Sequence, residues 1–251
     1  MPGHFECIGL ESHEEVVEAI ERAASGHLET ERSDGGSRFI WRDLDGARLV
    51  VNTDSGGAVV CAAPSFAGET SVDVEEQEIV RDSECAFCSR LLVNVLEDGE
   101  LVYPLAAQTE EMRPDRQVVE GKRRLSITLF VEEAELWTDE MAYDETSASS
   151  EIRFAPRSLI PVGTFPPNFP KRRRFWQRRR YEPTAQALVT GVVSEARTRR
   201  NSATEREFAW ANLESLGASY DIVAPLEAVG GGFSSGNVVR ASCWAIAREP
   251  D

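Results

Sequence analysis

The residues best suited to contact a charged partner lie within one short stretch, where seven cations and three aromatic side chains occupy eleven positions. These residues are Lys171, Arg172, Arg173, Arg174, Phe175, Trp176, Arg178, Arg179, Arg180 and Tyr181. Guanidinium groups neutralise phosphates, and aromatic rings stack on unpaired bases. This basic segment is therefore the candidate contact site for single-stranded nucleic acid or for a protein partner.

The charge of the remaining chain favours a different interpretation of the basic segment. The chain contains 27 Lys and Arg against 43 Asp and Glu, which gives a formal net charge of -16. Carboxylates tethered nearby compete with any phosphate for the same cations. In the interpretation that we prefer, the segment docks on the protein's own acidic surface. A partner-binding arm and a nuclear-localisation-like signal are further alternatives.

The cysteines and histidines do not form a pattern typical of a metal or redox centre. Cys85-Ala86-Phe87-Cys88 has the spacing of half a zinc site, but a structural zinc ion needs four ligands and no second pair follows. Cys7, Cys61 and Cys243 are isolated, and the histidines all lie within the first 27 positions. We expect no metal and no cofactor, and we interpret Cys85 and Cys88 as small buried residues at a strand edge.

No residue pattern indicates catalysis either. Nucleophilic attack by Ser or Cys needs a positioned base, which is usually a histidine. The acids Glu132, Glu133, Glu135, Asp139 and Glu140 could serve a hydrolase, but a chain with 43 acids produces such a cluster by abundance, so we interpret it as a solvated face. The glycine-rich stretches lack the Lys and Ser/Thr of a phosphate loop. We expect no catalytic residue and a non-enzymatic protein, with a hydrolase as the weaker alternative.

The ends and the hydropathy of the chain bear on its location. Residues 1–15 lack a cationic region followed by an apolar one, and no stretch reaches the roughly 20 apolar residues that span a bilayer. Five scattered cysteines fit a reducing compartment better than a disulfide framework. We therefore expect a cytoplasmic protein without a membrane segment.

The clearest helix signal follows Ser12. Ser12 and Glu15 have the spacing of a capping box, and Val16, Ile20, Ala23 and Ala24 form one apolar stripe. Gly26 is the expected end of this helix. Residues 4–10 are interpreted as a short strand that leads into it.

From residue 38 onward the pattern predicts strands. The expected strands are 38–44, 47–53, 58–63, 70–80, 87–96, 100–106, 125–137, 152–154, 187–196, 208–216, 220–224 and 238–247. Asp45-Gly46 and Asp98-Gly99 are dipeptides typical of tight hairpins. The polar stretches 138–150 and 197–205 are interpreted as a loop and a turn. The fold class is therefore α+β, with strands predominating.

Proline spacing places the expected boundary between domains. Four prolines fall within residues 161–170 and the cations follow directly, so this piece should run extended and cannot enter a central strand. We expect an α+β region at 1–160, a Pro-rich and then basic linker at 161–183, and a small β-barrel at 184–251.

The last region carries a resemblance. The residues concerned are Thr190-Gly191-Val192-Val193, Asn201, Phe208, Trp210, Leu216-Gly217, Asp221-Ile222-Val223-Ala224, Gly236-Asn237-Val238-Val239 and Trp244. This pattern resembles the C-terminal module of a family of uncharacterised bacterial proteins, and that module is similar to an OB-like barrel. The resemblance implies a fold and no activity, because OB barrels bind nucleic acids, saccharides and proteins alike.

Overall fold

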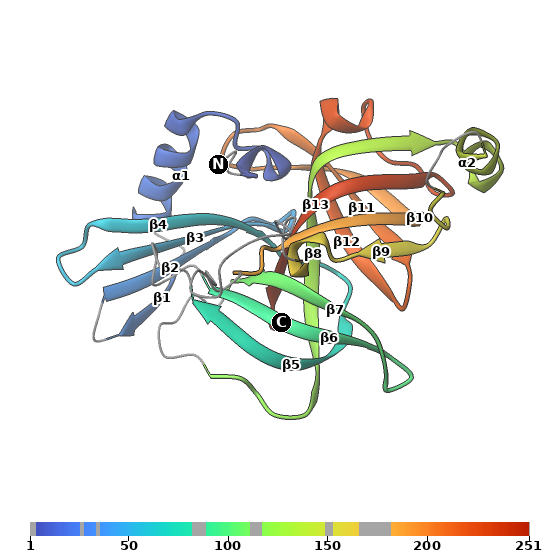
Figure 1. Ribbon diagram of the computed structural model, residues 1–251. Helices are drawn as coiled ribbons and strands as arrows, with labels where there is room; N and C mark the ends of the chain where they lie inside the picture. Colours follow the sequence, from blue (N-terminus) through green and yellow to red (C-terminus); the bar gives the residue numbers. More distant parts are fainter. Residues whose placement is uncertain are drawn as a thin grey trace, which may run out of the picture.

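The computed structural model describes residues 4–25, 28–33, 36–81, 89–110, 117–148, 153–165 and 182–250. Strands dominate this part of the chain (Figure 1), which confirms the strand-rich α+β prediction. The helices are α1 (His13–Ser25) and α2 (Glu140–Ser147), with short 3-10 helices η1 (Phe5–Ile8), η2 (Val162–Thr164) and η3 (Leu226–Val229). None of the helices described is long and apolar enough to cross a membrane.

The first sheet is an antiparallel meander near the N-terminus. Its strands are β1 (Leu28–Ser33), β2 (Gly36–Arg42), β3 (Ala47–Asp54) and β4 (Val59–Phe66), and they neighbour one another in chain order. The β2–β3 turn includes Asp45-Gly46, as expected, and Gly46 has a φ of 91°. A positive φ of this kind favours glycine because it has no Cβ.

The second sheet contains all the other strands described. They are β5 (Val72–Arg81), β6 (Ser89–Glu97), β7 (Glu100–Thr109), β8 (Lys122–Trp137), β9 (Ser158–Ile160), β10 (Gln186–Arg200), β11 (Glu207–Ser215), β12 (Ala218–Pro225) and β13 (Val238–Arg248). The neighbouring strands β8 and β13 run antiparallel through the middle of the molecule (Figure 1). The β5–β7 meander lies toward one end of this ribbon and the β10–β12 meander toward the other.

The strand neighbours form two closed circuits that share the β8–β13 ribbon. One circuit runs β8, β5, β6, β7, β13 and back to β8. The other runs β8, β12, β11, β10, β13 and back to β8. Each circuit contains one parallel pairing, which is β7–β13 in the first and β12–β8 in the second.

This topology disagrees with the expected division at residues 161–183. Strands from 72–137 and from 158–248 share one sheet, so residues 184–251 do not form a separate module and an OB-like barrel within them is not confirmed. The strands β9 and β10, which flank the expected linker, are themselves antiparallel neighbours, with Leu159 opposite Val189. Proline and charge spacing alone cannot tell whether the flanking strands pair.

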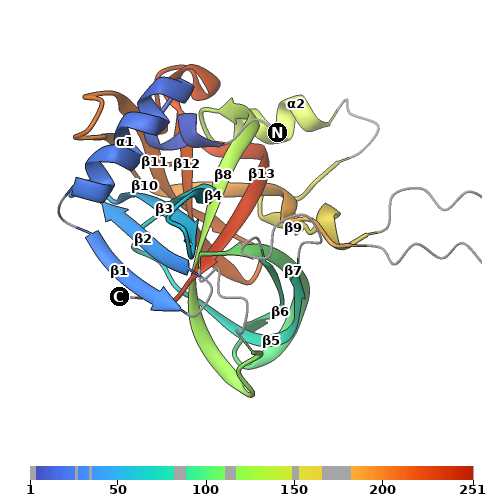
Figure 2. The same cartoon turned by 90° about the vertical axis from the view of Figure 1, so that its left-hand side faces the viewer.

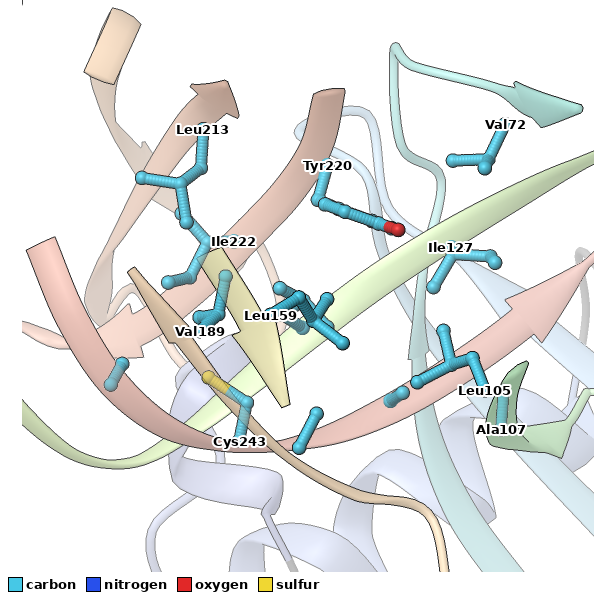
Figure 3. Close-up of a cluster of buried hydrophobic side chains, with 14 of the residues drawn as sticks. Val72, Leu105, Ala107, Ile127, Leu159, Val189, Leu213, Tyr220, Ile222 and Cys243 are labelled. Carbon is cyan, nitrogen blue, oxygen red and sulfur yellow. The ribbon is translucent and has the colours of Figure 1, made fainter. Parts of the chain in front are cut away.

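One apolar core joins both meanders. Figure 3 shows side chains from β5, β7, β8, β9, β10, β11, β12 and β13 directed toward a common interior. They include Leu105, Ile127, Leu159, Val189 and Ile222, and all of these are at most 6% exposed. Because burial of apolar area is the main driving force of folding, this shared core couples the two meanders energetically.

A second core packs the N-terminal region onto the outside of this sheet. Leu49 and Phe66 from the four-stranded sheet meet Phe208 and Trp210 from β11, together with Ile8 from η1. Figure 2 shows α1 beside the same four-stranded sheet. The N-terminal region thus covers the outer face of β11.

The helix predicted after Ser12 is confirmed, while its expected end at Gly26 lies outside the described residues. Ser12 Oγ accepts the Glu15 backbone N–H at 3.1 Å, and Glu15 Oε2 accepts the Ser12 N–H at 3.2 Å. Val16 and Ile20 pack in the second core as the stripe predicted. Burial opposes the shift, but hydrogen bonds from Glu11, Arg206 and Ser12 lower the pKa of Glu15.

Several local expectations were wrong. Residues 4–10 contain η1 rather than a strand, and 138–150 contains α2, which Asp139 caps by accepting the Ala142 N–H at 2.8 Å. Residues 153–154 are not in a strand, and β10 continues to Arg200 through the expected turn. A polar, alternating sequence is compatible with an exposed strand, and tertiary pairing with β11 determined the outcome there.

Candidate functional site

The candidate interaction residues belong to a connection whose two ends meet. Lys171, Arg172, Arg173, Arg174, Phe175, Trp176, Arg178, Arg179, Arg180 and Tyr181 lie outside the described residues. Before them, η2 follows β9, and after them the chain enters β10. The Thr184 N–H donates to the Gly163 carbonyl oxygen at 2.9 Å. The basic segment therefore belongs to a connection that leaves and rejoins one place in the sheet.

The close approach of the two backbones where the connection begins and ends requires glycine at position 163. A Cβ there would lie 1.9 Å from the Thr184 carbonyl oxygen. Next to Gly163 in the chain, the Thr164 backbone N–H and hydroxyl both donate to the Pro161 carbonyl oxygen, at 2.8 and 2.7 Å. The described ends of the connection are thus held by backbone contacts.

The C-terminal end of the connection also touches the first meander. Glu182 Oε2 lies 3.8 Å from the Arg90 guanidinium of β6. The Ala245 N–H of β13 donates to the Ala185 carbonyl oxygen at 2.8 Å. The residues that follow the basic segment are therefore fixed between β6 and β13.

The carboxylate of Asp221, which the sequence indicated only as part of a strand, accepts four hydrogen bonds. It is fully buried. Oδ1 accepts the Glu69 N–H at 3.0 Å and the Trp210 Nε1–H at 2.8 Å, while Oδ2 accepts the Thr70 N–H at 2.9 Å and its hydroxyl at 2.6 Å. These donors satisfy both oxygens of the buried carboxyl group. Asp221 thus fixes the chain between β4 and β5.

Two arginines complete this junction from the other side. The guanidinium carbons of Arg197 and Arg199 lie 5.2 and 4.6 Å from the centre of the buried Trp210 ring, within the range of cation–π attraction. Both arginines also pair with the Glu69 carboxylate. Arg248 donates to the carbonyl oxygens of Phe66 and Gly68 at 3.1 and 3.3 Å. We call Phe66–Thr70, with these side chains and Asp221, the sheet junction.

The sheet junction binds the protein's own backbone and side chains. Both oxygens of Asp221 are occupied, and a Cβ at Gly68 would lie 2.3 Å from Asp221 Oδ2. Its geometry is that of a structural clamp between the two sheets. The one signal in the sequence was the pair Trp210 and Asp221 on neighbouring expected strands, but nothing there indicates residues 66–70 as their partner.

The acids that could serve a hydrolase lie on β8 and at the start of α2. The predicted acids 132, 133, 135, 139 and 140 are all exposed, as a solvated face requires. Glu135 pairs with Arg240 and Glu140 with Arg157. Glu132 accepts the Ser242 hydroxyl at 3.0 Å and lies 3.9 Å from His4 Nε2.

The thiols near His4 are not activated as nucleophiles. Burial raises the pKa of Cys7 and of Cys243 well above the usual range, and in each case a nearby acid adds to the effect. Cys7 Sγ donates to the Val131 carbonyl oxygen at 3.3 Å. A protonated, buried thiol reacts slowly, because the thiolate is the nucleophile.

No group of three or more His, Cys, Asp or Glu side chains with a metal-binding arrangement occurs among the residues that the structure describes. Cys85 and Cys88 lie outside that part of the chain, so their expected burial stays a prediction.

Comparison with protein-family models, with curated proteins and with solved structures found no match to this chain. The resemblance to a bacterial family therefore also stays a prediction.

Proposed function

We propose that this is a non-enzymatic, cytoplasmic interaction protein that uses the basic segment Lys171–Tyr181 to contact an anionic surface on a protein partner. The observation that carries this proposal is the hydrogen bond between Thr184 and Gly163, which holds the two ends of the connection together. A recognition segment anchored at both ends loses less conformational entropy on binding than a free tail. The protein's own acidic surface is the competing target.

The arrangement of charge supports a role for this segment in particular. Many arginines in the described part of the chain already face acids, among them Arg123, Arg153, Arg157, Arg197, Arg206 and Arg240. An external anion must displace those acids before it can use the same cations. The seven cations of the basic segment are therefore the ones whose removal should change binding most.

The proposal is tested with the full-length chain and a variant in which the seven cations are replaced by glutamine. Each is used as bait against nuclease-treated extract from the source cells, and R124Q/R153Q serves as the control for exposed cations elsewhere. We expect defined proteins at near-stoichiometric amounts with the wild type and the control, and at least a tenfold loss with the seven-cation variant. Equal recovery by all three would contradict the proposal.

Single-stranded nucleic acid is the second candidate, and the strand circuits favour it. If β8 supplies the fifth strand, β10–β13 and β8 would form an OB-like barrel, a fold that often binds single strands. Seven phosphate contacts give a salt slope of about -5, so affinity should fall roughly a thousandfold between 50 and 200 mM salt. Fluorescence anisotropy with a labelled oligonucleotide measures this slope. A flat response, or no binding at low salt, would eliminate this candidate.

A further inference from the structure

The two strand circuits are related by more than their shared ribbon. In the first, β5 is antiparallel to β8 and β7 is parallel to β13. In the second, β10 is antiparallel to β13 and β12 is parallel to β8. Exchanging β5 with β10, β6 with β11, β7 with β12 and β8 with β13 turns one set of pairings into the other. The topology thus has an internal two-fold symmetry.

The middle strand of each meander and the turn after it repeat along with the topology. β6 and β11 each contain 9 residues. Each is followed by a two-residue turn whose second residue is a glycine with positive φ, which is 83° at Gly99 and 68° at Gly217. Ser89, Gly99 and Glu100 therefore lie the same number of positions before Glu207, Gly217 and Ala218. β5 and β10 each also carry one register shift against the strand that follows, between Glu76 and Glu78 and between Val193 and Glu195, at ladder positions two residues apart.

The inward-facing side chains follow the same correspondence. By ladder position, Tyr103, Leu105 and Ala107 of β7 match Tyr220, Ile222 and Ala224 of β12; the offset is one residue smaller than at the turn because Val102 has no partner in the β6–β7 ladder. All six belong to the shared core. The two tyrosine hydroxyls hydrogen-bond to each other in the interior. Contact between two equivalent side chains is what a two-fold axis produces, because a residue on the axis meets its own counterpart.

We infer that residues 72–137 and 186–248 are two copies of one four-strand unit, and that their contact is a homodimer-type interface enclosed in a single chain. The partner that each unit fits is a second copy of the same unit. Each unit contributes one strand to the central ribbon and pairs one meander end with the other unit's strand. Neither circuit closes without the other unit.

The N-terminal region breaks this symmetry. It covers the outer face of β11, where Phe208 and Trp210 are fully buried in the second core. The equivalent positions on β6 are Arg90 and Leu92, which are half-buried. A surface that is identical by topology is therefore apolar in the covered unit and mixed in the other.

Cleavage of the intact chain tests this inference. A specific protease site replaces residues 171–176, and the purified protein is cut and then examined by gel filtration and thermal unfolding over a hundredfold range of concentration. We expect the fragments to stay together at a 1:1 ratio, with a Tm that rises with concentration only after cleavage, because unfolding then separates two chains. Fragments that separate without denaturant, or a Tm independent of concentration, would overturn the inference.

A transplant tests the equivalence of the two units independently. The sequence of residues 207–224 replaces residues 89–107 in the full-length chain, one residue shorter because Val102 has no partner in the β6–β7 ladder. The control inserts residues 208–225 at the same place, which turns every side chain to the opposite face. We expect cooperative unfolding for the transplant and a Tm at least 10 °C lower, or no transition, for the control. Equal behaviour of the two chains would contradict a shared unit.

Discussion

The backbone N–H of Thr184 and the carbonyl oxygen of Gly163 are joined by a hydrogen bond of 2.9 Å, on either side of the most basic stretch in the chain. The stretch interrupts a pair of neighbouring strands in one sheet, β9 and β10. A link between independent domains would leave its two ends on separate bodies. In this protein the two ends are in contact.

Substitution of Gly163 by alanine should weaken the backbone contact between residues 163 and 184. The added Cβ would lie 1.9 Å from the Thr184 carbonyl oxygen, so the two backbones must separate. We expect a loss of about 1–3 kcal/mol in the free energy of unfolding, measured by urea denaturation. G56A is the matched control, since its Cβ would come no closer than 3.3 Å to the atoms around it. Equal losses of unfolding free energy in the two variants would contradict a close backbone contact between residues 163 and 184.

Substitution of Asp221 by asparagine should weaken the sheet junction. The amide retains one acceptor oxygen for a site where four donors converge. We expect the free energy of unfolding, measured by urea denaturation, to fall by about 2–4 kcal/mol. The control E227Q changes an exposed acid on η3 and should cost less than about 0.5 kcal/mol.

A double-mutant cycle with W210F measures the indole contribution to the same clamp. Phenylalanine keeps an aromatic ring but removes the N–H that reaches Asp221 at 2.8 Å. We expect a coupling energy of about 1 kcal/mol between W210F and D221N in urea denaturation. Additive losses would show that the two side chains do not act together.

The stability of the protein should depend on pH through His4. Burial lowers the pKa of His4 below 6.5, with partial opposition from Glu132 and Glu6, and the ring stacks on Trp244 at 5.6 Å. A histidine with a depressed pKa in the folded state binds fewer protons there than in the unfolded state. Its contribution to stability is therefore complete above pH 6.5 and is lost as the pH falls below that value.

The measurement is the Tm of the wild type and of H4Q between pH 7.5 and 5.5. The wild type should lose more stability on acidification than H4Q, because glutamine does not titrate. Parallel Tm curves would contradict a half-buried His4 whose pKa is lowered in the folded state.

Thiol labelling should distinguish the cysteines by burial. Cys61 is half-buried, while Cys7 and Cys243 are completely buried and their pKa values are raised. The experiment uses a C85S/C88S variant, so that only these three thiols remain. We expect a thiol reagent at pH 8 to modify Cys61 first, and the other two only at the rate of unfolding. Fast labelling of Cys7 or Cys243, located by mass spectrometry, would contradict the packing of η1.

Local chemistry carried much of the fold prediction. The capping box at Ser12 and the glycine turns at Gly46 and Gly99 depend on nearest neighbours, so the sequence indicates them directly. The α2 helix was missed because its polar residues gave no apolar stripe, although Asp139 is a good N-cap.

The long-range arrangement could not be read in the same way. Thr128 and Asp221 are neighbours across β8 and β12, yet nothing in the sequence of either strand indicates that it pairs with the other. Parallel pairing at such separation depends on the shared core. The sheet junction was missed for the same reason, since Glu69 and Asp221 meet only after both sheets have formed.

Native-state hydrogen exchange measured at increasing urea tests most directly the claim that the chain on both sides of the basic segment forms one folded body. Backbone amides of β8, β12 and β13 should share a single opening free energy, equal to that of global unfolding. If β10–β13 instead opened as a group at a clearly different free energy from β5–β8, the two parts would be independent domains, which contradicts a single folded body.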